Sequence, residues 1–138
     1  MLIQGDVTPG GLLLDAVVRL SGSTLEFKGP FRAQIDTGAS ISVVTNEVYV
    51  QSSLPFLGRA NVRTVGGDRM MVMSRIELGL MGEAGPFFFD TLVPVGVSAP
   101  VSDPNHLPAC DILIGMNAIS SGILTVDGPA RTFAFEIA

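Results

Sequence analysis

The chain has 138 residues, a net charge of −5, and 15% charged residues beside 47% hydrophobic ones. This length fits one domain over residues 1–138, built around a single hydrophobic core. An acidic chain without a basic stripe suits a phosphate backbone poorly, so the composition argues against nucleic-acid binding. The high glycine and proline content favours short strands joined by tight turns.

Alternating apolar residues predict β-strands in the first third of the chain. The apolar runs cover residues 12–20, 25–27, 31–35 and 41–44. We expect Gly29-Pro30 to break the pattern between the second and third runs. Residues 46–53 fit either a short helix or a loop.

The middle of the chain reads as a hairpin. Apolar arms at residues 62–65 and 71–80 flank Gly66-Gly67, and glycine accepts the positive φ that such turns demand. Residues 87–97 are almost entirely apolar and predict a further strand.

The last third predicts a buried strand at residues 112–114, a short helix within residues 116–121, and a final hairpin. Its last strand alternates Phe133, Phe135 and Ile137, and we expect this strand to offer an edge for pairing with a partner. The pattern as a whole predicts an all-β fold with one short helix near the C-terminus.

Few residues suit a metal or a membrane. Cys110 and His106 are the single residues of their types, which excludes an intrachain disulfide framework and a Cys/His metal cluster. We expect Cys110 to act as a small buried hydrophobic residue and His106 to lie in a solvated loop. Asp6 interrupts any signal-peptide pattern, and the apolar runs fall short of the roughly 18 residues of a membrane span. The expected location is cytoplasmic by default, with no cofactor.

One tripeptide has the parts for hydrolytic chemistry. Metal-free peptide hydrolysis needs two neighbouring carboxyls, one ionised to activate water and one that keeps its proton. A glycine after the carboxylate lets backbone N–H groups approach its oxygens, and a hydroxyl braces the turn. Asp36-Thr37-Gly38 has these parts at the end of an apolar strand. Alone, the tripeptide also fits an ordinary turn.

The surrounding sequence resembles the aspartic proteases. Residues 33–40, Ala-Gln-Ile-Asp-Thr-Gly-Ala-Ser, resemble the active-site strand and turn of that family. The Gly66-Gly67 hairpin stands where the family carries its flap, and Ile112-Leu113-Ile114-Gly115 resembles its hydrophobic-hydrophobic-glycine segment. Because the chain holds one Asp-Thr-Gly, it resembles the single-domain retropepsins, whose second carboxylate comes from a two-fold related subunit. That resemblance implies a closed, barrel-like fold with a flap hairpin.

The resemblance assigns roles to particular residues. Asp36 corresponds to the catalytic carboxylate, Thr37 to the residue that braces the carboxyl pair across the dimer axis, and Gly38 to the close turn. The resemblance also implies that the substrate contacts Ala39, Ser40, Val65, Gly66 and Gly67. The implied activity is that of an aspartic endopeptidase, an acid protease working as a homodimer on extended polypeptides.

Two positions depart from the viral pattern. Viral members often carry an aspartate where Ser40 stands and an arginine where Met116 stands, and those two form an ion pair. Because both charges are absent, neither is left buried without its partner. The sequence Asp-Thr-Gly-Ala-Ser is also more similar to the cellular and bacterial members. Two other interpretations stay open: a non-catalytic peptide-binding or dimerisation module with the retropepsin fold, and an all-β structural domain in which Asp36 only caps a turn.

Overall fold

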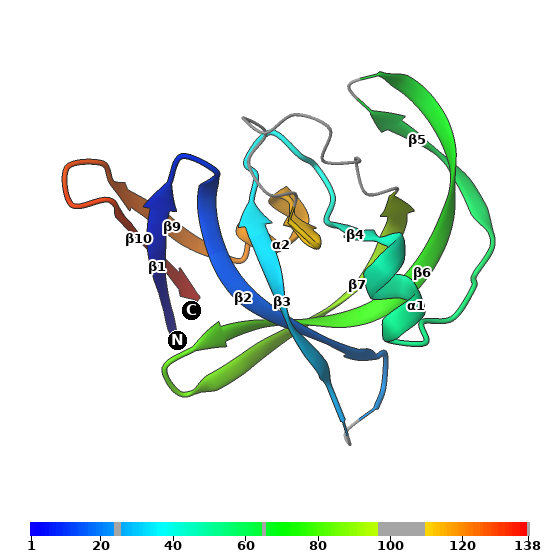
Figure 1. The fold of residues 1–138 in the computed structure, drawn as a ribbon, viewed down its shortest axis with the longest axis horizontal. Coiled ribbons are helices and arrows are strands. Elements are labelled where there is room, and N and C mark those ends of the chain that lie inside the picture. Colours follow the sequence, from blue (N-terminus) through cyan, green and yellow to red (C-terminus); the bar gives the residue numbers. More distant parts are fainter. Residues whose placement is uncertain (24–25, 65, 97–109, 138) are drawn as a thin grey trace.

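The computed structural model describes residues 1–23, 26–64, 66–96 and 110–137. Ten strands and two short helices follow one another along the chain (Figure 1). In chain order they are β1 (Leu2–Thr8), β2 (Gly11–Leu20), β3 (Lys28–Ile35), β4 (Val43–Thr45), α1 (Asn46–Gln51), β5 (Arg59–Thr64), β6 (Gly67–Gly82), β7 (Gly85–Gly96), β8 (Ile112–Ile114), α2 (Met116–Ile119), β9 (Gly122–Asp127) and β10 (Thr132–Ile137).

The strands form one mixed sheet that closes on itself. Their order is β5-β6-β7-β4-β8-β3-β2-β1-β10-β9, and β6 also pairs with β2. This extra pairing closes β6, β7, β4, β8, β3 and β2 into a six-stranded barrel, which removes sheet edges within the ring. The β3–β8 and β4–β7 pairs are parallel, and the other pairs are antiparallel. The predicted all-β, barrel-like fold is confirmed.

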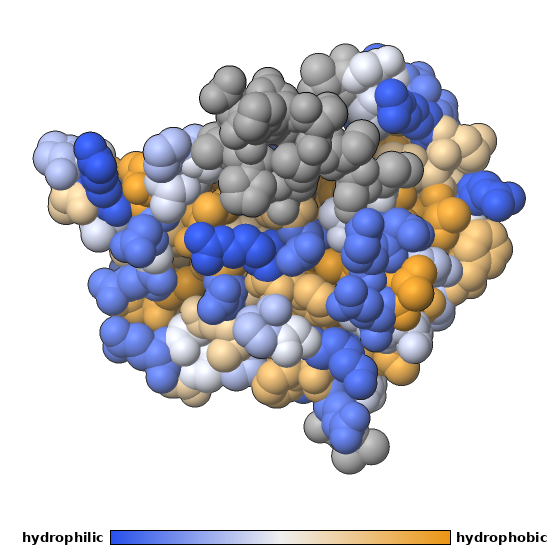
Figure 2. Space-filling view, in the orientation of Figure 1, coloured by the Kyte–Doolittle hydropathy of each residue, from blue (hydrophilic) through white to orange (hydrophobic). Residues whose placement is uncertain are grey.

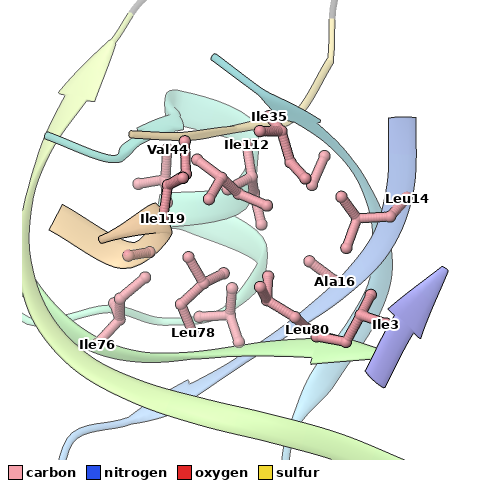
Figure 3. Close-up of a cluster of buried hydrophobic side chains, with 14 of the residues drawn as sticks. Ile3, Leu14, Ala16, Ile35, Val44, Ile76, Leu78, Leu80, Ile112 and Ile119 are labelled. Atoms are coloured by element: carbon pink, nitrogen blue, oxygen red, sulfur yellow. The ribbon is translucent and has the colours of Figure 1, made fainter. Parts of the chain in front are cut away.

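Alternating inward residues of the barrel strands form the core, as a period of two requires. Ala16 and Val18 on β2 face Leu78 and Leu80 on β6, and all four are fully buried. Figure 3 shows Ile35, Val44, Ile112 and further apolar side chains pointing into the same interior from other strands. Burial of these side chains holds together the strands that carry Asp36.

Two parts project from the barrel. The hairpin of β5 and the first half of β6 extends away from the ring, while β1, β10 and β9 form a sheet extension on the opposite side (Figure 1). The β5–β6 hairpin is the one predicted at Gly66-Gly67, with Thr64 paired to Gly67.

The structure corrects several sequence expectations. The segment at residues 46–53 contains helix α1, because Thr45 caps its N-terminus by accepting a hydrogen bond from the Val48 N–H. Gly29-Pro30 interrupts the strand pairing without ending the strand: β3 includes both residues, and its register with β2 shifts between the Ala16–Phe31 and Val18–Lys28 pairs. The strand β1, for which no prediction was made, pairs with β10.

The C-terminal strand was expected to offer an edge, and this expectation is wrong. β10 lies between β1 and β9, so both of its sides are already paired, and Phe133, Phe135 and Ile137 are buried. Their alternation marks an inward face instead of an edge. Among the described strands, β5 and β9 form the two ends of the sheet order.

Candidate active site

Asp36 is positioned by the end of a barrel strand. It follows β3 directly, and its backbone N–H donates to the Ile114 carbonyl of the neighbouring strand β8 at 2.9 Å. Its Oδ1 accepts a hydrogen bond from the Gly38 backbone N–H at 2.8 Å. The side chain is partly exposed, so the carboxylate has both a fixed orientation and access to water.

The turn after Asp36 is fastened to the segment that follows β8. The Ala39 N–H donates to the Asp36 carbonyl at 3.2 Å, and the Ala39 carbonyl accepts from the Met116 N–H at 2.7 Å. The Ser40 carbonyl accepts from the Asn117 N–H at 3.1 Å. The Ile112–Gly115 segment, which resembles the hydrophobic-hydrophobic-glycine segment of the aspartic proteases, therefore packs beside this turn.

Gly115 permits this close packing. A Cβ at position 115 would overlap the backbone carbonyl of Ile41, so a larger residue cannot occupy the site without moving one of the two segments. The need for glycine here is steric and does not depend on a positive φ.

A polar cluster around the buried Ser42 hydroxyl braces the same turn and was not predicted as part of the site. The Ser42 hydroxyl is fully buried, donates to Asn117 Oδ1 at 2.9 Å and accepts from the Gly115 N–H at 3.0 Å. The Ser42 N–H also donates to Asn117 Oδ1 at 3.0 Å, and Asn117 Nδ2 donates to the Thr91 hydroxyl at 2.9 Å. This cluster joins the active-site turn, α2 and β7. Sequence patterning cannot reveal such a cluster, because its members lie 75 and 26 residues apart.

Asp36 lies in a cleft of about 530 Å³. Three further residues predicted for the site, namely Gly38, Ala39 and Ser40, line this cleft together with Asp36. Apolar side chains line most of the remainder: Ile41, Val43, Val62, Met71, Pro94 and Leu113. The β5–β6 hairpin therefore borders the cleft that contains Asp36.

The hairpin contributes residues other than the predicted Gly66 and Gly67 to the cleft lining. Gly66 and Gly67 are exposed at the turn and do not line the cleft, whereas Val62 and Thr64 of β5 do. Val62 and Thr64 are the half-buried positions of an alternating strand, a signal that was present in the sequence. Val65 falls outside the described residues.

Thr37 is exposed, and within the described ranges its hydroxyl makes no hydrogen bond. The side chain is therefore available for a contact beyond this chain. Ser40 is exposed and Met116 is 39% exposed, so neither position buries an unpaired polar group in this chain.

The remaining candidates are not part of the cleft. Cys110 is half-buried, with its Sγ 3.7 Å from Gln34 Oε1, and burial raises the pKa of its thiol. His106 lies outside the described residues. Among the described residues no group of three or more His, Cys, Asp or Glu side chains is arranged to hold a metal ion, and no helix is long and apolar enough to cross a membrane.

The chain is similar to known proteins in sequence and in fold. No protein-family model matches it. It is 28% identical over 123 residues, or 88% of its length, to the multifunctional protein CAD of Squalus acanthias, and it spans 5% of that protein. The crystal structure of a retropepsin-like aspartic protease from Rickettsia conorii matches with a TM-score of 0.59 and 14% identity, over 98% of this chain and 90% of the other.

The simian foamy virus (mac) protease matches more distantly, with a TM-score of 0.42, 16% identity, and 78% of this chain and 91% of the other covered. The Rickettsia match extends over almost the whole chain. The chain therefore has the fold of the retropepsin-like aspartic proteases.

Proposed function

We propose that the chain is one subunit of an aspartic endopeptidase that acts as a homodimer. The observation that carries this proposal is the position of Asp36 in an apolar cleft, with Oδ1 held by the Gly38 N–H, within a retropepsin-like fold. A carboxylate that only caps a turn has no need of such a cleft.

The chemistry requires a second carboxyl. The chain has a single Asp-Thr-Gly, and within the described residues Asp36 is the only acidic residue of the cleft lining. A two-fold related copy would supply the second Asp36. Because two like charges in one site cannot both ionise easily, one carboxyl would hold its proton and act as the acid while the other activates water.

Exposed residues around the turn support a second copy. Thr37 and Gly38 lie on the surface beside Asp36, as residues at a two-fold axis must in an isolated subunit. Among the described strands, β9 pairs with β10 alone and so has an outer edge, with Ile123 66% and Val126 50% exposed. Edge strands with exposed apolar residues favour pairing with another chain. Sedimentation analysis should detect a dimer, and a fully active monomer at every concentration would contradict the proposal.

The expected substrate is an extended polypeptide. It would add a strand between the active-site turn and the β5–β6 hairpin, with pockets for alternate side chains. Ala39 and Ser40 would contact it from the turn, and Val65, Gly66 and Gly67 would do so once the hairpin closes over the substrate. Since the cleft lining is mostly apolar, hydrophobic side chains would flank the cut bond.

The deciding experiment compares cleavage of a peptide library by the wild-type chain and by Asp36→Asn between pH 4 and pH 8. The wild type should cleave, with activity biased to acidic pH, and Asp36→Asn should lose roughly 10³-fold or more. A statine-type transition-state mimic should inhibit the wild type. Peptide binding without cleavage by the wild-type dimer would instead identify a binding module, and equal cleavage by both proteins would exclude Asp36 as the catalyst.

A further inference from the structure

The β5–β6 hairpin has a charge opposite to that of the whole chain. We call residues 59–70, which include this hairpin's two arms and turn, the flap hairpin. It contains three arginines and one acidic residue, in a chain with 8 basic and 13 acidic residues and a net charge of −5. The three arginines are Arg59, Arg63 and Arg69. Figure 2 shows hydrophilic residues over the projecting end of this hairpin.

These arginines are exposed and weakly paired. Arg63 Nε lies 3.9 Å from Asp68 Oδ1, and the two side chains are 92% and 58% exposed, so solvent screens this pair strongly. Arg59 lies with its guanidinium carbon 5.8 Å from the centroid of the Phe56 ring. Within the described part of the chain, Arg59 and Arg69 form no ion pair.

Arg69 places its charge at the tip of the flap hairpin. A Cβ at Gly66 would lie 3.5 Å from Arg69 Nη2, so the guanidinium lies against the turn. Arg69 pairs in register with Val62, whereas Arg63 pairs with Asp68. Side chains of directly paired residues share one face of a hairpin, so Arg69 and Arg63 lie on opposite faces. Both faces of the flap hairpin therefore carry a guanidinium.

The lining of the Asp36 cleft offers little negative charge to neutralise these arginines. Among the described residues that line the cleft, Arg63 is the only basic one and Asp36 the only acidic one. Arg75, further along β6, is already paired with Asp90 at 3.0 Å. Among the described residues, the positive charge nearest the cleft is therefore that of the flap hairpin.

We propose that the flap hairpin recognises acidic residues of the substrate on either side of the apolar segment that occupies the cleft. This inference rests on the proposed peptidase function and adds to it a substrate class. Exposed charges of one sign attract a charged ligand over a distance of about 8–10 Å at ordinary ionic strength and act mainly on its association rate. A homodimer would bring two such hairpins to one cleft and double the positive charge.

The test uses three peptides with one neutral apolar core that the wild type cleaves. The residues outside the core are all Glu, all Gln or all Lys. At low salt, kcat/KM should fall from the Glu to the Gln to the Lys peptide by about five-fold at each step, within the range of electrostatic steering. The differences should shrink to less than about two-fold at 0.5 M salt, because the Debye length is then near 4 Å.

A matched pair of double variants locates the effect. Arg63→Gln with Arg69→Gln should remove most of the preference for Glu, so that kcat/KM for the Glu and Gln peptides differs by less than about two-fold at low salt. Lys28→Gln with Arg32→Gln makes the same charge change on exposed residues of β3, away from the flap hairpin, and should keep the preference.

The outcomes separate this inference from the proposed function. Cleavage of the Gln peptide with no difference among the three peptides overturns the inference alone. Equal loss of preference in both double variants also overturns it, since the preference would then reflect net charge. If the wild type cleaves no peptide, the proposed function fails, and fluorescence anisotropy of the same three peptides on Asp36→Asn still tests the charge preference through their Kd values.

Discussion

The two walls of the Asp36 cleft are built in opposite ways. The active-site turn is held by backbone hydrogen bonds to Ile114, Met116 and Asn117 and by the fully buried Ser42 hydroxyl. In the flap hairpin, β5 is an end strand that pairs with β6 alone, and the turn is exposed. One wall thus fixes the position of a carboxylate, while the other depends, among the described strands, on the pairing of β5 with β6.

Substitutions in the active-site turn should therefore affect folding stability, whereas substitutions in the flap hairpin should affect only turnover. Many interlocked contacts make the turn a part of the core, so its disruption should cost stability. The flap hairpin contributes half-buried residues such as Val62 and Thr64 but buries no residue of the core cluster. Its disruption should leave the barrel intact.

The largest effect on stability is expected from Gly115→Ala. The new Cβ would overlap the Ile41 carbonyl and push the active-site turn away from the strand end of β8. Overpacking of this kind should lower the free energy of unfolding by about 3 kcal/mol. Urea denaturation measures it, with Gly128→Ala as the control, because no atom lies within 4 Å of a Cβ at that position. Equal midpoints for the two variants would show that the turn is not tightly fastened.

A smaller loss of stability is expected from Ser42→Ala. The change removes a buried hydroxyl and leaves the Gly115 N–H without its acceptor and Asn117 Oδ1 without one of two donors. Such a buried unsatisfied donor should cost about 2 kcal/mol. Ser42→Thr keeps the hydroxyl and should recover most of the loss in the same denaturation experiment. If alanine and threonine behave alike, the hydroxyl is not what joins the turn to α2.

The flap hairpin should respond in turnover more than in stability. Gly67 has a φ of 104°, which a β-branched residue resists, so Gly67→Val should cost only about 1 kcal/mol yet misshape the turn. Peptide cleavage should fall several-fold while the barrel unfolds at nearly the wild-type urea concentration. Gly66→Ala is the neighbouring control, since a Cβ there meets only ordinary contacts. Unchanged cleavage by Gly67→Val would show that the hairpin does not close on substrate.

The smallest effect on stability is expected at the exposed Arg75–Asp90 ion pair, which joins β6 to β7. A hydrogen bond from the Arg75 guanidinium lowers the pKa of the Asp90 carboxyl. A carboxyl pKa lowered by folding adds stability above its unfolded value, and that stability is lost as pH falls through the folded value. Asp90→Asn should therefore be slightly less stable than the wild type at pH 7 and equal to it near pH 2.

Thermal unfolding at both pH values measures this difference. The exposed Glu83, in the turn between β6 and β7, provides the control variant Glu83→Gln. Because the Arg75–Asp90 pair is exposed, solvent screening should keep the effect small. A large difference between Asp90→Asn and wild type at pH 2 would mean that the substitution acts through packing and not through charge.

The fold was predictable to the extent that it depends on local patterns. Alternation identified the strands around residues 12–20, 31–35 and 71–80, and the Gly66-Gly67 pair identified the hairpin between β5 and β6. Both signals are local, because a strand's two faces and a turn's φ angles depend on neighbouring residues. The Asp-Thr-Gly context identified the turn that lies in the cleft.

The errors occurred where distant segments decide the outcome. Phe133, Phe135 and Ile137 alternate as an edge strand would, but pairing with β1 makes β10 an interior strand. The choice between helix and loop at residues 46–53, which the sequence left open, depends instead on a local contact, the Thr45 cap of α1. A strand's own pattern shows which face is buried, and it does not show which strands lie beside it.

Local sequence was enough to predict the strand periodicity, the hairpin turn and the single Asp-Thr-Gly that underlies the proposed two-copy site. The tertiary structure alone shows that Ser42, Thr91 and Asn117 meet behind the active-site turn. It also shows that Val62 and Thr64 line the cleft. The physical reason is the range of the interactions. Backbone preferences and alternation act between neighbours in the chain, whereas the closure of β6 onto β2 joins residues about 60 positions apart and thereby sets which side chains share a space.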